Sequence, residues 1–125
     1  MRLIYIAGQY NNDTFAGIDR NIKIADALGQ EIVKRFGQQG VFVIIPHNNT
    51  PLHWKGIQSD EWFYEATLSL LRKCDACVVV PGSEKTSIGT QGEIKYCQEN
   101  EVPYFMGDQV GLRLFKAWLN RMRLD

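Results

Sequence analysis

The sequence lacks an excess of charge of either sign. Its 125 residues include 14 Lys and Arg and 14 Asp and Glu, so the formal net charge is zero. A balanced chain produces no overall field that attracts nucleic acid or an anionic membrane surface. We therefore expect a small-molecule ligand, and we expect neither a nucleic acid polymer nor a membrane as a partner.

Long hydrophobic runs are also missing. The apolar start MRLIYIA ends at Gly8. No later run approaches the ~18 apolar residues that indicate a membrane span, and none resembles the hydrophobic region of a signal peptide. We therefore expect a cytoplasmic protein.

Cysteine is scarce, and its pattern argues against two structural roles. The chain has Cys74, Cys77 and Cys97. An odd number of cysteines without a secretion signal indicates reduced thiols rather than a disulfide framework. Cys74 and Cys77 have a CxxC spacing, but no second CxxC or cluster of histidines follows, so we expect no metal site. We also expect the protein to use no cofactor.

Repeats, linkers and low-complexity segments are absent, which predicts one domain over residues 1–125. Short apolar runs without polar alternation, typical of buried parallel strands, alternate with segments of helical periodicity. This order predicts right-handed βαβ units and an α/β fold with helices on both faces of a parallel sheet. The expected strands are Leu3–Ala7, Val41–Ile45, Asp75–Val80 and Pro103–Met106. The first expected helix begins after the Gly8–Gly17 loop and ends at Gly37 and Gly40. The other expected helices are Asp60–Lys73, Ser87–Asn100 and a last helix that begins at an Asp108 cap and ends at Met122.

Three of the predicted loops should form one crevice. In open parallel sheets, ligands bind beyond the carboxyl ends of the strands, where the strand order reverses. The loops at that edge are Gly8–Gly17, Pro46–Gln58 and Pro81–Thr90. We expect the functional residues to come from these segments.

The stretch PGSEKTSIGTQGEIKYC, from Pro81 to Cys97, has the pattern of an anion site. It places a turn rich in Gly, Ser and Thr between a buried strand and a helix, whose free N–H groups and dipole attract anions. Glu93 lies less than two turns into this helix. A carboxylate beside an anion site suits attack on the anomeric carbon of a sugar phosphate. Alternatively, Glu93 only interacts favourably with the helix dipole and has no catalytic role.

Four segments together resemble the nucleoside 2-deoxyribosyltransferase-like superfamily: IYIAGQY, PHN, CDA and PGSEKTSIGTQGEI. They are most similar to a small uncharacterised branch common in phages and bacteria, over roughly residues 1–105. The resemblance implies a flavodoxin-like (Rossmann-like) three-layer sandwich with a four- or five-stranded sheet, assembled as a homodimer or higher homo-oligomer. It also implies chemistry at an N-glycosidic bond, with Glu93 as the nucleophile of a covalent glycosyl intermediate.

Ser87 distinguishes two activities within that superfamily. Nucleoside transferases carry Asp six residues before the catalytic Glu, whereas deoxynucleoside-monophosphate N-glycosidases, which this segment also resembles, carry Ser. A hydroxyl at a helix N-terminus donates to a phosphate that a carboxylate would repel. The resemblance therefore implies an N-glycosidase that hydrolyses a (deoxy)nucleoside 5'-monophosphate. The alternatives are a nucleoside 2-deoxyribosyltransferase and a catalytically silent nucleotide-binding module.

The chain departs from the glycosidase pattern at two places. Thr67 stands where the resemblance predicts an Asp proton donor, and the first loop has no Ser and Arg for phosphate. Lys85 or Arg20 would have to supply the positive charge. The acids that are candidates to replace the proton donor are Asp60, Glu61 and Glu65.

The remaining site residues are expected in the crevice loops. Thr90 should help Ser87 and Gly89 to bind phosphate, and Gly8 should let the backbone approach the sugar. Tyr10 or Trp54 should stack on a base, while Trp62, Phe63 and Tyr64 should lie mostly in the core. Asn48 or Asn49 should contact the sugar or base. His47 and His53 are either general acids or loop-packing residues.

Overall fold

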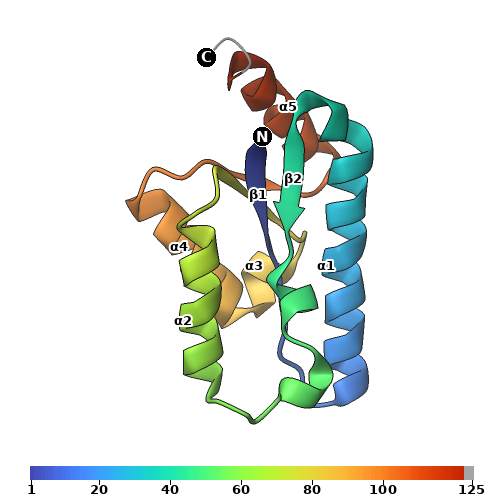
Figure 1. Cartoon of the computed structure of the whole chain (residues 1–125), viewed down its shortest axis with the longest axis vertical. Coiled ribbons are helices and arrows are strands. Elements are labelled where there is room, and N and C mark those ends of the chain that lie inside the picture. The colour runs from blue at the N-terminus through green and yellow to red at the C-terminus, as the bar shows by residue number, and fades with distance from the viewer. Residues whose placement is uncertain (123–125) are drawn as a thin grey trace.

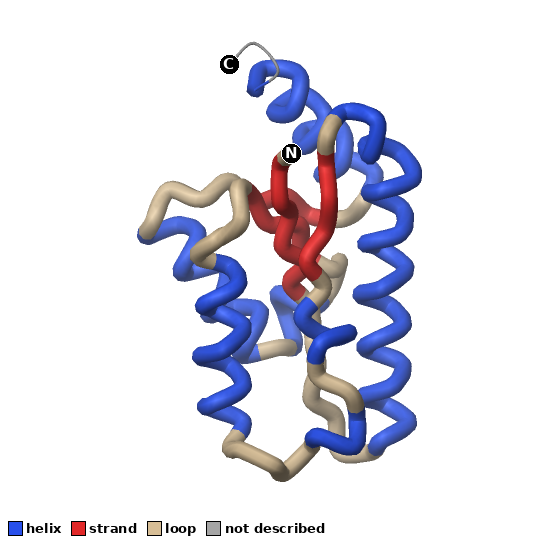
Figure 2. The backbone as a smooth tube through the Cα atoms, viewed as in Figure 1, coloured by secondary structure: helices blue, strands red, loops and turns tan. Residues whose placement is uncertain are grey.

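The computed structural model describes residues 1–122, so the end of the predicted 1–125 domain lies outside the described part. Its centre is a four-stranded parallel sheet in the order β2-β1-β3-β4. Figure 2 shows the strands between two groups of helices. The strands are β1 (Arg2–Ala7), β2 (Val41–Ile44), β3 (Ala76–Val79) and β4 (Tyr104–Met106).

Helices cover both faces of the sheet. Figure 1 shows α1 (Phe15–Phe36) on one side, and α2 (Asp60–Leu71) with α4 (Ile88–Glu99) on the other. The helix α5 (Gln109–Met122) joins α1, because its side chains share a core cluster with α1 and with one face of β1 and β3. The predicted three-layer α/β fold is therefore confirmed, with four strands.

The central strands are apolar on both faces because each face is covered. Ile4 and Ile6 of β1 point into the core with α1 and α5, whereas Tyr5 and Ala7 pack with α2 and α4. Alternation along a strand sends successive side chains to opposite faces. It thereby places the phenol of Tyr5 on the α2 and α4 side, fully buried.

Each long helix begins at a side-chain cap that satisfies a free backbone N–H group. Thr14, Ser59 and Ser87 accept from the third residue beyond them at 3.0 to 3.1 Å, and Asp108 accepts from Gly111 at 2.7 Å. Such caps stabilise a helix by about 1 kcal/mol. The cap at Asp108 was predicted, and the Thr14 cap starts α1 inside the segment predicted to be loop.

The structure corrects several predicted boundaries and burial assignments. The Pro81–Thr90 segment contains a short helix, α3 (Ser83–Thr86), which follows Gly82 at φ 91°. Two 3-10 turns, η2 (Pro46–Asn49) and η3 (Leu52–Trp54), shape the loop after β2. Trp62 is 53% exposed because it lies near the start of α2, beyond the sheet.

The last helix covers a sheet face. Phe115 packs its ring against Phe105 of β4 and Phe36 of α1, with centroids 5.5 and 5.2 Å apart, and Trp118 lies beside both Phe105 and Phe115. These contacts show that α5 covers this face of the sheet. Within residues 1–122, none of the helices has the length and apolar character needed to span a membrane.

Candidate active site

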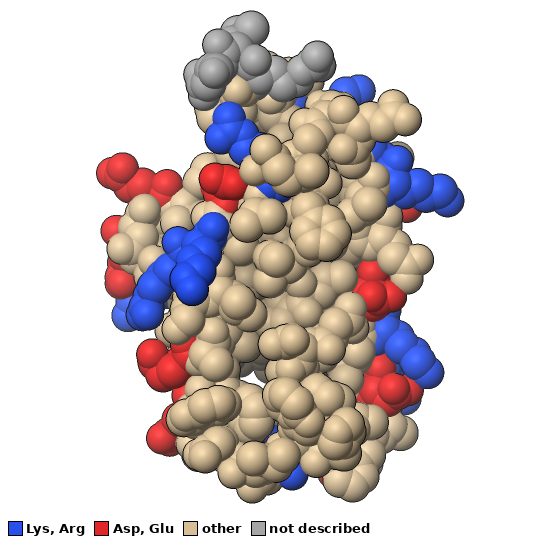
Figure 3. Space-filling view, in the orientation of Figure 1, with Lys and Arg blue, Asp and Glu red and all other residues tan. Residues whose placement is uncertain are grey.

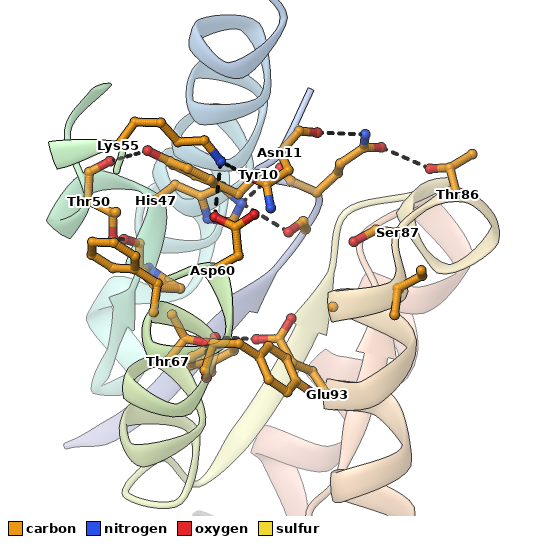
Figure 4. Close-up of a pocket in the computed structure, with 18 residues that line it drawn as sticks. Tyr10, Asn11, His47, Thr50, Lys55, Asp60, Thr67, Thr86, Ser87 and Glu93 are labelled. Carbon is orange, nitrogen blue, oxygen red and sulfur yellow. Dashed lines mark hydrogen bonds and ion pairs between the residues drawn. The ribbon is translucent and has the colours of Figure 1, made fainter. Parts of the chain in front are cut away.

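A cavity of about 350 Å³ lies at the carboxyl ends of β1 and β3. This is where the strand order reverses, because the chain passes from β1 to β2 on one side and returns to β3 on the other. Parts of all three predicted crevice loops line it, together with one face of α2. Figure 4 shows Glu93 and Thr67 at its inner end, and Tyr10, Asn11 and Lys55 at its outer end.

Glu93 is a buried carboxyl group that lines this cavity. It is 5% exposed, and the hydroxyl of Tyr5 donates a hydrogen bond to its Oε2. Burial raises the pKa of Glu93 from 4.5 to about 7, and the hydrogen bond from Tyr5 opposes the increase. Glu93 therefore ionises around neutral pH rather than well below it.

Tyr5 stays protonated and can serve as a lasting donor to Glu93. Burial raises the pKa of the Tyr5 phenol well above its usual value, the negative charge of Glu93 raises it further, and a hydrogen bond with Thr67 opposes the increase. The single hydroxyl proton of Thr67 is donated to the Tyr64 carbonyl at 2.8 Å. Sequence reasoning missed Tyr5, because its apolar surroundings indicated an ordinary core residue.

Position 67 carries no acid, and the three candidate replacements differ in location. Glu61 and Glu65 are exposed and do not line the cavity, whereas Asp60 does. The Oδ1 atom of Asp60 lies 3.1 Å from Nζ of Lys55. Asp60 is therefore the one of the three that lies at the site.

The positive charge at the cavity comes from a residue that was not predicted. Lys55 lines the cavity, and its Nζ donates to Oδ1 of Asn11 at 2.7 Å. Lys85 and Arg20 are exposed and do not line the cavity, because they lie on the outer sides of α3 and α1. Lys55 belongs to a predicted crevice loop, but nothing in its local pattern marked it.

The N-terminus of α4 opens onto the cavity. Ser87 caps this helix by accepting from the Thr90 N–H at 3.1 Å, which leaves its own hydroxyl proton free to donate. Ser87, Ile88 and Gly89 line the cavity, but Thr90 does not. Thr90 is fully buried, and its Oγ1 has no hydrogen-bond partner within the described residues.

The loop after β1 contributes Gly8 and Tyr10 to the cavity wall. A Cβ atom on Gly8 would lie 2.8 Å from a methyl group of Val80, so packing against the start of the next loop requires glycine there. The hydroxyl of Tyr10 donates to the Thr50 carbonyl at 2.7 Å. This bond ties the first crevice loop to the second.

His47 lines the cavity but is held as a packing residue. Its Nε2 lies 3.1 Å from the carbonyl oxygens of both Gly8 and Gln9, and burial lowers the pKa of the imidazole. The ring is therefore neutral at pH 7 and donates through Nε2. His53 is exposed and does not line the cavity.

Asn48, Asn49 and Trp54 do not line the cavity. The η2 turn directs Asn48 toward α1, where its Nδ2 donates to Asp26 at 2.8 Å. Trp54 is 41% exposed and packs edge-on against His53. Phe63 and Tyr64 of α2 supply aromatic walls instead, which sequence reasoning had assigned mainly to the core.

The thiols and acids of residues 1–122 do not gather into a metal site. Cys74, Cys77 and Cys97 are free, and Cys77 and Cys97 are buried. Within the described part of the chain, His, Cys, Asp and Glu do not gather in a group of three or more that could hold a metal ion.

The fold and the cavity define an α/β protein with a ligand pocket at the carboxyl edge of a parallel sheet. The chain belongs to the family described as a domain of unknown function, DUF7768, whose model matches residues 2–106. No curated protein matches the sequence. The fold is similar to the solved structure of a 2-deoxyribosyltransferase from the psychrotolerant bacterium Bacillus psychrosaccharolyticus, with a TM-score of 0.55 and 19% identity over 83% of this chain and 70% of that chain.

Proposed function

We propose that the protein binds a nucleoside 5'-monophosphate and hydrolyses its N-glycosidic bond through a covalent glycosyl intermediate on Glu93. The observation that carries this proposal is the buried Glu93 carboxyl group, which lines the cavity close to the N-terminus of α4 and ionises near neutral pH. A nucleophilic carboxylate and an anion-binding helix end are what attack on a sugar phosphate requires.

The reaction proceeds in two steps. An oxygen of the Glu93 carboxylate attacks the anomeric carbon, and the C–N bond breaks with its electron pair on the base. Water then hydrolyses the glycosyl ester, which releases the sugar phosphate and restores Glu93. Tyr5 orients the carboxylate throughout, because it donates to Oε2 and leaves Oε1 for attack.

Neutral donors hold the phosphate in this proposal. Ser87 donates through its hydroxyl, Gly89 lies in the first turn of α4, and the helix dipole adds a favourable field. Thr90 does not contact the phosphate but holds Ser87 in place, because its backbone N–H donates to the Ser87 hydroxyl oxygen. Thr86, whose hydroxyl donates to Gln9 at 3.0 Å, joins this side of the cavity to the first loop.

Aromatic side chains supply the base-binding surface. Tyr10, Phe63 and Tyr64 all line the cavity. Flat apolar rings bind a nucleobase by stacking, which is worth about 1–3 kcal/mol per base.

Two other functions have support of their own. The fold similarity to a 2-deoxyribosyltransferase favours transfer of deoxyribose to a second base, in which a base replaces water in the second step. The threonine at position 67 favours a silent nucleotide-binding module, because a hydroxyl there cannot protonate a departing base.

Chromatography of reaction mixtures tests the three functions together. The protein is incubated with each common nucleoside 5'-monophosphate and nucleoside, with and without a second free base. Free base with sugar phosphate indicates hydrolysis, and a new nucleoside or nucleotide indicates transfer. Glu93→Gln serves as the inactive control. If ligands bind but no glycosidic bond is cleaved, the module is silent.

A further inference from the structure

Lys55 is the one Lys or Arg side chain that lines the cavity within residues 1–122. It follows η3, and it joins two other segments of the site. Its Nζ lies 2.7 Å from Asn11 Oδ1 in the loop after β1, and 3.1 Å from Asp60 Oδ1 at the start of α2. An ammonium group has three protons, so one proton remains for a ligand.

The position of Lys55 matches the base of a bound nucleotide. Figure 4 shows Lys55, Asp60 and Tyr10 on one side of the cavity, with Thr86 and Ser87 on the other and Glu93 at the inner end. The base is attached at C1' and the 5'-phosphate is carried by C4', so the two groups extend from opposite ends of the sugar. With the phosphate at Ser87 and the anomeric carbon at Glu93, the base therefore reaches the wall formed by Tyr10, Lys55 and Asp60.

The chemistry of the leaving base requires a positive group at that wall. Cleavage of the C–N bond leaves an electron pair on the base, and that charge spreads to the carbonyl oxygens and ring nitrogens at its edge. Thr67 has no acidic proton to offer. A fixed ammonium that contacts the base edge stabilises the developing charge.

We propose that Lys55 binds the edge of the nucleobase and stabilises the negative charge that develops on it, with Asp60 and Asn11 holding the ammonium in place. This inference rests on the proposed function. As the Glu93 oxygen bonds to the anomeric carbon, the C–N bond breaks and the base departs as an anion paired with Lys55. Water protonates the base after its release.

Lys55→Met tests this role with substrates of different leaving ability. Uracil nucleotides are compared with 5-fluorouracil nucleotides, and purine nucleotides with their N7-methylated forms, whose bases leave more easily. We expect the kcat of Lys55→Met to fall about a hundredfold or more for the poor leaving base and far less for its activated partner. Lys85→Met, an exposed lysine away from the cavity, is the matched control and should match the wild type.

Two results would overturn the inference. An equal loss for both members of each pair would show that Lys55 only ties its loop to α2. A loss confined to nucleotides, with nucleosides unaffected, would assign Lys55 to the phosphate. Failure of the proposed function itself looks different, because the wild type would then release no base from any substrate.

A binding measurement tests the contact even if the wild type cleaves nothing. The probe is 2'-deoxypseudouridine 5'-monophosphate, whose C–C glycosidic bond cannot be hydrolysed. Calorimetry should show that Lys55→Met binds it at least about tenfold more weakly than the wild type, which corresponds to roughly 1.4 kcal/mol. Affinity for deoxyribose 5-phosphate, which has no base, should be unchanged. An equal loss for both probes contradicts a contact with the base.

Discussion

Tyr5 and Glu93 are 88 positions apart in the sequence, and the phenol of one donates a hydrogen bond to the carboxylate of the other inside the sheet–helix core. The central strand therefore supplies both a packing residue and the hydrogen-bond partner of this carboxyl group. Burial raises the pKa of Glu93 while this hydrogen bond lowers it, so the strand helps to set the pH at which the carboxyl group ionises.

Replacing Glu93 by Gln should separate binding from turnover. The amide keeps the size and hydrogen-bonding capacity of the side chain but cannot form the glycosyl ester. We expect kcat to fall by several orders of magnitude while nucleotide affinity changes little, measured by base release and by calorimetry. A variant that retains substantial base release would exclude Glu93 as the nucleophile.

The free energy of unfolding should fall as the pH rises from about 4.5 to about 7. The pKa of Glu93 is 4.5 in its ordinary state and about 7 in the fold, so the folded chain retains a proton that the unfolded chain has lost across this window. The contribution is fully present below the lower value and is lost above the upper one, and it amounts to roughly 3 kcal/mol. Urea unfolding at several pH values measures it. Glu93→Gln should flatten this part of the profile, and an unchanged profile would contradict the assignment.

Tyr5→Phe should shift the pH dependence of activity to higher pH. The hydrogen bond from Tyr5 lowers the pKa of Glu93, so its removal raises that pKa and reduces the ionised fraction at pH 7. We expect kcat at pH 7 to fall roughly tenfold or more, with partial recovery at higher pH. Tyr104→Phe is the control, because that hydroxyl bonds to Gln98 and Tyr104 does not line the cavity. An identical fall at every pH would show loss of packing alone.

Ser87→Asp should remove the preference for nucleotides over nucleosides. Aspartate also caps helices well, so α4 should survive, but its charge repels a phosphate. For the wild type, a nucleoside 5'-monophosphate at about a hundred times its Kd should add roughly 2.7 kcal/mol of stability, and the matching nucleoside at the same concentration should add less. Thermal shifts measure both. Equal shifts for the two ligands with the wild type would contradict phosphate binding.

The chain should assemble as a homodimer or a larger homo-oligomer. The edge strand β2 exposes Phe42 to 54%, and Phe42, Ile44, Pro46 and Leu70 line a shallow apolar groove. Figure 3 shows that the middle of the face around β2 carries almost no charged side chains. Such a surface suits burial against a second copy. Light scattering at tens of micromolar protein should report at least a dimer. Phe42→Lys should weaken this self-association. A monomeric wild type would contradict this prediction.

Most of the fold could be predicted from the sequence, because buried parallel strands and amphipathic helices have distinct periodicities. Glu93, Ser87 and Gly89 lie at the cavity because they belong to one continuous strand–turn–helix segment, whose local pattern specifies their geometry. Lys55 lies in a loop whose path depends on tertiary contacts, so no periodicity marked it. Tyr5 was missed for a different reason, since a buried strand gives no sign of which hydroxyl has a partner.

The same dependence on distant contacts explains the misplaced loop residues. Asn48 and Trp54 belong to a predicted crevice loop, but short 3-10 turns rotate them away from the cavity. Phe63 and Tyr64 of α2 line the cavity, although their helical spacing predicted core positions. The choice between core and cavity for these residues depends on helix placement rather than on local sequence.

The aromatic contacts of α5 show that the packed domain extends beyond the residues that the family model matches. The family match ends at residue 106, yet Phe115 and Trp118 lie beyond it and cover Phe105 within it. A shortened chain that stopped at residue 106 would expose Phe105 and the part of this sheet face that α5 covers, and it would tend to aggregate.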